Sequence, residues 1–322
     1  MKPCAVWQFL ASPTVKLMKN IIDPISRALL KKELTPERFV RKTNFGENEI
    51  YIINHHNSPN TMLEIGRLRE ISFRAAGGGT GEEVDIDVND TCEIPYEQLL
   101  VWNPEDEQIT GGYRYINCKN ALFLDGELNL STAHLFHFSP VFIEKYIPKT
   151  IELGRSWVQP AYQPSAANRR GIFSLDNLWD GLGALVGRYP EVDYFFGKVT
   201  MYPHYQREAR DLLLAFMKFY FPDNDRLVWP IHEVKHDFDI HEMQQQFHGL
   251  SYKEGYMILN RRVRELGENI PPLINSYMNL SATMRTFGTA VNDLFGDVEE
   301  TGIMVAIDDI YPSKKDRHLI VH

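Results

Sequence analysis

Two spacings of hydrophobic residues recur along the chain, and each predicts a different kind of element. Apolar residues that run together or alternate with polar ones predict strands, and these segments are 50–53, 98–102, 109–116, 150–158, 192–201 and 302–307. Apolar residues that recur every three or four positions predict helices, and these segments are 61–74, 175–186, 209–220 and 271–283. Strands and helices mixed throughout the chain indicate an α/β or α+β domain.

Short signals mark where several of these elements begin and end. Thr61-Met62-Leu63-Glu64 has the spelling of a capping box, and Ser174 is a suitable N-cap for the helix that follows it. The turn-forming residues 103–106 join two strands as a hairpin. The glycine-rich residues 77–81 follow a helix and lack the Lys-Ser/Thr of a phosphate-binding loop. We therefore expect a plain loop there, which bears on function only if it closes over a substrate.

Residues 1–48 are interpreted as a separate, basic amphipathic segment. Within residues 14–33, basic residues are interspersed with aliphatic ones, and Pro24 interrupts the pattern and would split a helix. The pattern favours either a peripheral contact with an anionic membrane surface or a helix that covers the domain. Residues 49–322 are expected to form a single domain that contains a polar, histidine-rich insertion at about 222–270.

Composition narrows the class of protein. The 322 residues are 43% hydrophobic and 24% charged, with a net charge of −9, which is the balance of an ordinary globular domain rather than a disordered chain. The negative charge argues against nucleic acid as the partner, and no apolar run reaches the ~18 residues of a membrane-spanning helix. Cys4, Cys92 and Cys118 are too scattered for a disulfide framework or a zinc knuckle, which favours a reducing, cytoplasmic location.

The residues from His232 to His236 match the HExxH motif of zinc hydrolases. That chemistry needs both histidines on one face of a buried helix, with Glu233 as the general base. Pro230 lies two residues upstream and Lys235 lies inside the motif, so we interpret the segment as a polar loop that binds no metal. A zinc hydrolase that uses His232, Glu233 and His236 is kept as an alternative.

A second set of chemically informative residues is spread over the predicted elements. Its members are Arg69, Phe73, Glu83, Asp85, Asp87, Arg114, Glu152 and Arg155. Each charged member, taken singly, is consistent with a surface charge or a structural ion pair. Because side chains alternate along a strand, Glu152 and Arg155 face opposite sides of the sheet unless a bulge lies between them.

Taken in order, these residues resemble the motifs of a known family. The motifs are Arg69-x-x-x-Phe73, Glu83-x-Asp85-x-Asp87, Gly112-Tyr113-Arg114 and Glu152-x-x-Arg155. They are similar to those of the acyl-carrier-protein-dependent branch of the GNAT acyltransferases. That branch includes the acyl-homoserine-lactone synthases and, closer still, the hemolysin-like N-acyltransferases that begin ornithine-lipid and glycine-lipid synthesis. Residues 98–102, 178–181 and 270–277 match as well, so the resemblance covers about residues 50 to 310.

The resemblance implies a fold and a reaction. The GNAT fold is a twisted mixed sheet flanked by helices and splayed at its central strand, here residues 150–158, where an acyl-pantetheine arm enters. The reaction transfers an acyl group from a thioester to an amine, which must first lose a proton. Glu152 is the predicted general base or water-orienting residue, and a backbone N–H of the splayed strand would bind the oxyanion.

The resemblance also suggests roles for the remaining charged residues. Arg69, Arg114 and Arg155 are suited to grip the carboxylate of an amino-acid acceptor in bidentate geometry. Alternatively, they pair with acidic residues and only brace the site. Asp85 completes the set of candidate catalytic residues, and we expect it to order the loop after the first helix rather than to perform chemistry.

The loop after the splayed strand departs from that of CoA-dependent relatives. A CoA-binding GNAT enzyme has a Gln/Arg-x-x-Gly-x-Gly/Ala motif there, and residues 163–171 lack it. Arg169, Arg170 and Gly171 instead precede a helix start at Ser174, a place suited to a single phosphate. The predicted donor is therefore the acyl-phosphopantetheine of acyl-carrier protein rather than CoA, with no permanently bound cofactor.

The sequence thus predicts an N-acyltransferase in the cytoplasm, peripheral on the inner face of the membrane. It would move a long, 3-hydroxylated acyl chain from acyl-carrier protein to the α-amino group of an amino acid, with glycine and ornithine as the leading acceptors. The chain length and hydroxylation are implied by the family alone. The acidic carrier protein would bind a local basic patch, formed by Arg169, Arg170, Arg207 and Arg210. The alternatives are a CoA-dependent acetyltransferase, a zinc hydrolase and a non-enzymatic membrane-binding protein.

Overall fold

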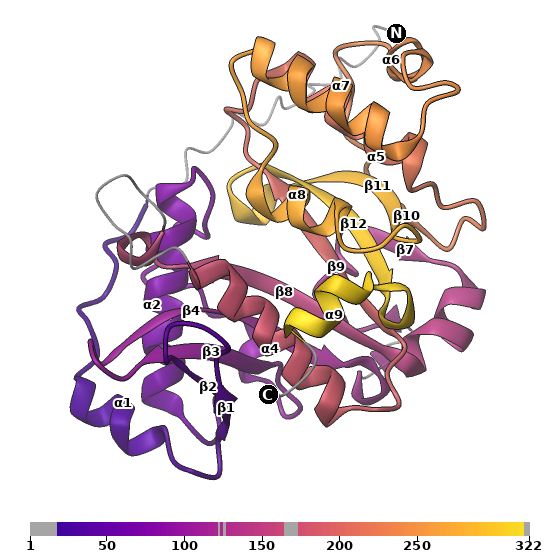
Figure 1. Cartoon of the computed structure of the whole chain (residues 1–322). Coiled ribbons are helices and arrows are strands. Elements are labelled where there is room, and N and C mark those ends of the chain that lie inside the picture. Colours follow the sequence, from indigo (N-terminus) through magenta and orange to yellow (C-terminus); the bar gives the residue numbers. More distant parts are fainter. Residues whose placement is uncertain (1–17, 122, 125–126, 164–172, 319–322) are drawn as a thin grey trace, which may run out of the picture.

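The computed structural model describes residues 18–121, 123–124, 127–163 and 173–318, which form one large sheet flanked by helices (Figure 1). The sheet has eight strands in the order β1-β2-β3-β4-β8-β9-β12-β11. Their bounds are β1 Phe39–Lys42, β2 Glu49–Ile53, β3 Glu97–Asn103, β4 Gln108–Asn117, β8 Thr150–Val158, β9 Tyr194–Met201, β12 Val298–Ala306 and β11 Arg285–Asn292. The predicted mixed α/β architecture is confirmed.

The sheet is splayed between β8 and β9, next to its centre. Every neighbouring pair in it is antiparallel except β8 and β9, which are parallel. The β8–β9 pairing runs from Thr150 opposite Tyr194 to Leu153 opposite Gly197. Both strands continue past these last partners, to Val158 and Met201, without further pairing between them in the described sheet. The strands therefore diverge at the position that the sequence assigned to the splay.

Two helices cover opposite faces of the first half of the sheet, because side chains alternate along its strands. Tyr51 and Ile53 of β2 pack with α2 (Pro59–Ala75), whereas Ile50 and Ile52 pack with α4 (Ser174–Arg188). Both helices were predicted from their hydrophobic spacing. Figure 1 shows α4 and α2 in separate layers, with the sheet between them.

The second half of the molecule packs α5 (Arg207–Tyr220) and α8 (Pro272–Met278) against β9 and β12. Within the predicted insertion, α7 (Tyr252–Glu265) lies on α5, so this segment is largely packed rather than a free loop. The predicted helix 271–283 ends early, at Met278, and the strand β11 that follows it was not predicted. The other elements are α3 Val88–Thr91, β5 Phe123–Leu124, β6 Glu127–Leu128, β7 Phe136–Phe138, β10 Val228–Pro230, α6 Ile240–Gln245 and α9 Pro312–His318.

The predicted capping box at the start of α2 is wrong. The helix begins two residues earlier than predicted, at Pro59, and a carboxylate distant in sequence caps it. Glu33, the last residue of α1 (Arg27–Glu33), accepts hydrogen bonds from the backbone N–H groups of Asn60 (3.1 Å) and Thr61 (2.7 Å). Glu64 instead accepts a bond from the backbone N–H of Ile25 at 3.0 Å. The signal failed because a tertiary contact supplied the acceptor that the helix N-terminus needs.

Ser174 is not the N-cap of α4. The capping position is Phe173, and the Ser174 hydroxyl donates a hydrogen bond to the backbone carbonyl of Tyr162 at 2.9 Å. In the N-terminal segment, the described residues before Pro24 are not helical and the first helix begins at Arg27, so the predicted amphipathic helix is present only on the C-terminal side of Pro24. Among the described residues, no helix combines the length and the apolar character needed to cross a bilayer.

Candidate functional site

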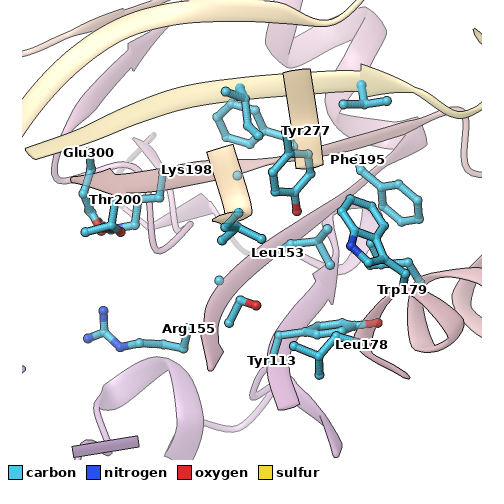
Figure 2. A pocket seen from close by; sticks show the side chains of 18 of the residues that line it. Tyr113, Leu153, Arg155, Leu178, Trp179, Phe195, Lys198, Thr200, Tyr277 and Glu300 are labelled. Atoms are coloured by element: carbon cyan, nitrogen blue, oxygen red, sulfur yellow. Dashed lines mark hydrogen bonds and ion pairs between the residues drawn. The ribbon is translucent and has the colours of Figure 1, made fainter. Parts of the chain in front are cut away.

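A cavity opens where β8 and β9 diverge, and it has a polar end and an apolar end (Figure 2). Its free space is about 870 Å³, including an open mouth. The charged and hydroxyl side chains at one end are Arg155, Lys198, Thr200 and Glu300. Figure 2 shows Leu178, Trp179, Phe195 and Tyr277 at the other end. Further apolar residues that line the cavity are Leu175, Leu182, Leu273, Ile303 and Val305. In Figure 2 Leu153 of β8 lies between Arg155 on one side and Trp179 and Phe195 on the other.

A β-bulge in β8 lies beside the cavity. Gly154 pairs with Arg114 and Trp157 pairs with Gly112, so Arg155 and Ser156 together lie opposite the single residue Tyr113. Arg155 has a φ of 49°, in the left-handed region that a non-glycine residue enters at a cost of about 1 kcal/mol or more. Strain of this kind persists where the surrounding structure enforces it, and it is common at functional sites.

The bulge brings Arg155 and Glu152 into one network of contacts, which regular alternation along β8 would prevent. Arg155 Nε lies 3.0 Å from Asp85 Oδ2, and its guanidinium stacks on the Phe295 ring at 4.0 Å. Glu152 accepts a hydrogen bond from the Tyr96 hydroxyl, and the Arg114 guanidinium lies over that same Tyr96 ring. The exception that the sequence reasoning allowed, an intervening bulge, is therefore the arrangement found.

Three arginines and three aspartates form a buried cluster next to the bulge. Arg69 is fully buried; its Nε lies 3.1 Å from Asp85 Oδ2, and its Nη2 lies 3.4 Å from Asp90 Oδ2. Arg114 Nη1 lies 2.8 Å from Asp87 Oδ1 and 3.1 Å from Asp90 Oδ2. The six formal charges balance, as buried charges require. Of the three arginines, only Arg155 lines the cavity.

Asp90 was missed by the sequence reasoning, although a local signal for it exists. Asp87 caps α3, and Asp90 three residues later completes a capping box with it. Burial disfavours ionisation of Asp90, but Arg69 and Arg114 outweigh that cost and hold its pKa well below the ordinary value. Burial likewise opposes ionisation of Asp85, and Arg155 and Arg69 lower its pKa overall. Both carboxylates are therefore ionised at neutral pH.

Glu152, the predicted base, is fully buried and saturated with hydrogen bonds. Besides Tyr96, its carboxylate accepts from the backbone N–H and the hydroxyl of Ser131, each at 3.2 Å, and from the backbone N–H of Thr132 at 3.0 Å. It is not among the residues that line the cavity. The structure thus places Glu152 where it fixes the 131–132 turn against β8.

The carboxylate that does line the cavity is Glu300 on β12. It forms an ion pair with Lys198 of β9, and it also accepts from Thr200 Oγ1 at 3.3 Å and from Asn292 Nδ2 at 3.0 Å. Burial would raise the pKa of Glu300, but Lys198 lowers it overall; the pKa of Lys198 is itself lowered, chiefly by burial. Sequence reasoning missed the pair because its predicted strand began at residue 302. Lys198 and Thr200, two positions apart on one strand face, were the available signal.

Tyr113 carries an unpaired polar atom within the apolar part of the site. Its side chain is 4% exposed, and its hydroxyl has no hydrogen-bond partner among the described residues. Tyr113 and Tyr277 both line the cavity. A buried hydroxyl without a partner costs about 1 to 3 kcal/mol, so a polar atom of a bound molecule would be stabilised here.

The structure tests the predicted donor-binding residues only in part. Arg169, Arg170 and Gly171 lie outside the described residues. Arg210 is 1% exposed and pairs with Glu299 at 2.9 Å, so its assignment to a surface basic patch is wrong. Arg207 pairs with the same Glu299 at 2.7 Å. Both arginines neutralise a carboxylate of the sheet, a role that local sequence does not reveal.

The HExxH segment is not helical, so it lacks the geometry that a zinc hydrolase of this type needs. Glu233 forms an isolated β-bridge with Ala290, and His236 Nδ1 lies 3.1 Å from Asp211 Oδ1. Within the described part of the chain, no group of three or more His, Cys, Asp or Glu side chains is arranged to hold a metal ion.

Comparisons with known proteins identify a matching family model and close relatives of this chain. A family model for an acetyltransferase (GNAT) domain matches residues 68–170. A glycine N(alpha)-acyltransferase of Bacteroides thetaiotaomicron is 56% identical over 303 residues, which is 94% of this chain and 90% of that protein. A glycine N(alpha)-acyltransferase of Phocaeicola vulgatus is 54% identical over 303 residues, 94% of this chain and 93% of that protein. Among solved structures, the AHL synthase LasI aligns with 48% of this chain and 72% of its own, at 12% identity and a TM-score of 0.31, too low to support an argument.

Proposed function

The chain belongs to the glycine N(alpha)-acyltransferase family and is an N-acyltransferase, and we propose that it transfers a long acyl chain from a pantetheine thioester to the amino group of glycine. The observation that carries this proposal is the two-ended cavity at the splay. Its apolar end suits an acyl chain, and its polar end offers Arg155, Lys198 and Glu300 to a small zwitterion. The two ends meet at the β8 bulge, where the thioester carbonyl would lie.

Glycine fits the polar end better than ornithine does. Among the described lining residues, Glu300 is the only carboxylate, and Lys198 already pairs with it. The side-chain ammonium of ornithine would need a second acidic partner, because a buried charge without one is costly. The carboxylate of glycine can instead bind Arg155, whose guanidinium Asp85 holds through its Nε. The two relatives are both named glycine N(alpha)-acyltransferases, and their names support the same acceptor.

In this proposal Glu300 takes the place that the sequence gave to Glu152. Glu300 lines the cavity beside Lys198, and its carboxylate is the candidate group to accept a proton from the glycine ammonium. The amine then attacks the thioester carbon, the C–N bond forms and the C–S bond breaks. Lys198, whose pKa burial lowers, is suited to protonate the departing thiolate. Of the two protons that the ammonium loses, one ends on the thiol and one in solvent. A backbone N–H of the bulge is the candidate oxyanion donor.

The acyl donor is proposed to be acyl-carrier protein, with a 3-hydroxylated chain. Residues 163–171 lack the motif that wraps the pyrophosphate of CoA, and the cavity reaches Leu175 in the first turn of α4. The unpaired hydroxyl of Tyr113 gives a 3-hydroxyl group a partner inside the apolar end. A peripheral membrane contact by the basic segment 14–33 remains a prediction, and flotation with anionic lipid vesicles would test it.

The decisive experiment compares Glu300→Gln with Glu152→Gln. The assay supplies plain and 3-hydroxylated hexadecanoyl carrier protein with glycine or ornithine and detects N-acyl amino acids by mass spectrometry. We expect Glu300→Gln to lower kcat by about 100-fold or more, the usual contribution of a positioned base. We expect Glu152→Gln to lower the thermal midpoint, because it disturbs a saturated buried network, with less than a tenfold loss of kcat in the folded fraction.

If Glu152→Gln lowered kcat more than Glu300→Gln did, Glu152 rather than Glu300 would be the general base. Lys198→Met combined with Glu300→Gln removes both charges of the pair at once. This double variant separates lost chemistry from the instability of an unpaired buried lysine. Wild-type protein that acylates neither amino acid from an intact donor would refute the proposed function.

A further inference from the structure

A second, smaller cavity lies directly behind the apolar end of the first. It has about 380 Å³ of free space, including an open mouth. We call it the far cavity, and we call the cavity at the splay the near cavity. The two share five lining residues, which are Trp179, Leu182, Phe195, Tyr277 and Val305. The residues particular to the far cavity are Leu280, Ile310, Lys314 and His318. The shared side chains therefore form a partition rather than a closed end.

Two aromatic rings form the core of this partition. Trp179 of α4 and Tyr277 of α8 meet edge to face, with ring centroids 5.3 Å apart and an interplanar angle of 64°. Leu182 and Val305 also belong to the partition, because each of them lines both cavities. Beyond its burial, an aromatic pair of this kind contributes only about a two- to thirteenfold shift in an equilibrium. An acyl chain inserted between the two rings would keep both of them buried, so that contribution is what their separation loses.

The far cavity is apolar on its walls and is bounded on its outer side by α9. Leu280 and Ile310 are each less than 10% exposed. A hydrogen bond and an ion pair hold α9 against α4: His318 Nδ1 lies 2.8 Å from Asp180 Oδ1, and Arg317 pairs with Asp176. A space lined mainly by apolar side chains, with Lys314 and His318 of α9 at its edge, offers water few partners, so it is suited to an apolar occupant.

We propose that the acyl chain of the donor passes between Trp179 and Tyr277 into the far cavity, and that this pair sets the chain length at which the second compartment begins to be used. The inference rests on the proposed function, which places the acyl chain in the near cavity. Short chains end at the partition, whereas long chains bury their last methylenes against Leu280 and Ile310. Each methylene so buried gives roughly a fourfold gain in affinity.

A substitution that fills the far cavity alone tests this arrangement. Leu280→Phe adds a ring to a residue that lines only the far cavity. The matched control is Ile274→Phe, which makes a similar addition on α8, in the same core cluster, at a residue that lines neither cavity. Calorimetry with hexadecanoyl-pantetheine and octanoyl-pantetheine then gives a ratio of affinities for each protein, which does not depend on turnover.

We expect Leu280→Phe to lower the hexadecanoyl-to-octanoyl affinity ratio by about tenfold or more, the worth of two or three buried methylenes. The control should keep the wild-type ratio within about twofold. Trp179→Leu, which removes half of the partition, should raise the ratio. An unchanged ratio in Leu280→Phe, with the protein folded, would overturn the inference. Failure of the wild-type protein to acylate glycine would refute the proposed function. The affinity ratios would still show whether long acyl chains enter the far cavity.

Discussion

Individual charged residues in this protein divide into those that stabilise and those that line the cavity. Arg69, Asp90 and Glu152 are almost fully buried and paired, and none of them lines the near cavity. Arg155 belongs to both groups, since Asp85 holds it on one side while it faces the cavity on the other. Replacing a member of the first group should therefore show first in stability, and its effect should depend on pH.

Asp90→Asn should destabilise the protein by about 3 kcal/mol or more at pH 7, because it leaves Arg69 and Arg114 undercompensated in the interior. The folded-state pKa of Asp90 is lowered, so its contribution is complete above the unfolded pKa of about 3.9 and is lost as pH falls below that value. The gap between wild type and variant should be constant from pH 7 to 5 and then narrow. Urea unfolding at pH 7, 5, 4 and 3.5 measures it.

The control for that series is Asp316→Asn, at an exposed position of α9, which should follow the wild-type curve. A gap for Asp90→Asn that stayed constant down to pH 3.5 would contradict the assignment of its lowered pKa to the buried arginines.

At the level of elements, the position of α4 on the sheet depends on one glycine. A Cβ atom at Gly181 would lie 2.6 Å from Leu99 Cδ2 and 2.9 Å from the Tyr113 hydroxyl. The helix therefore sits close enough to β3 and β4 for Trp179 and Leu182 to reach the cavity. A Cβ atom at Gly187, near the end of the same helix, would meet no heavy atom within 4 Å among the described residues.

The two glycines predict opposite effects of one substitution. Gly181→Ala should destabilise the protein by about 1–3 kcal/mol, because the added methyl group overpacks the interface between α4 and the sheet. Gly187→Ala should raise stability by about 0.4–1 kcal/mol, because alanine loses less backbone entropy in a helix and meets no neighbour. The measurement is the thermal midpoint of unfolding for each variant. Equal changes of the midpoint in the two variants would show that α4 does not pack tightly on the sheet at Gly181.

At the level of the whole molecule, an acidic enzyme is proposed to meet an acidic carrier protein. The net charge of −9 opposes that encounter over long range, so local cations must favour it. Arg207 and Arg210 are engaged by Glu299 and cannot supply them freely. The expected basic patch therefore reduces to Arg169 and Arg170, next to the start of α4 in sequence.

Replacing both Arg169 and Arg170 by alanine should raise KM for acyl-carrier protein by about tenfold, since two cations proposed to attract the acidic carrier protein are removed. The effect should shrink at 0.5 M salt, where charges are screened within a few ångströms. The measurement is KM by steady-state kinetics, once with the carrier-bound donor and once with acyl-pantetheine, which lacks both the carrier protein and the phosphate. The control pair is Arg261→Ala with Arg264→Ala, on the exposed side of α7. Equal losses with both donors would place the two arginines outside carrier recognition.

Local patterns in the chain were enough to predict most of the central elements and the family. Hydrophobic spacing located α2, α4, α5 and the strands β3, β4, β8 and β9, because one buried face suffices to specify each of them. The ordered motifs then identified the splayed strand, which runs from Thr150 to Val158 as predicted. Capping was predicted less well, because at α2 the acceptor came from Glu33 in another helix.

Which charged residues share the near cavity became clear from the three-dimensional arrangement of the strands. Lys198 and Glu300 are 102 positions apart in the chain, and they meet because β12 lies beside β9. Glu152 and Arg155 are three positions apart, and a bulge opposite Tyr113 decides that they join one network. Periodicity records which face of one element is buried, whereas register, bulges and strand order arise from packing between elements. The site depends on register, bulges and strand order, and periodicity does not record them.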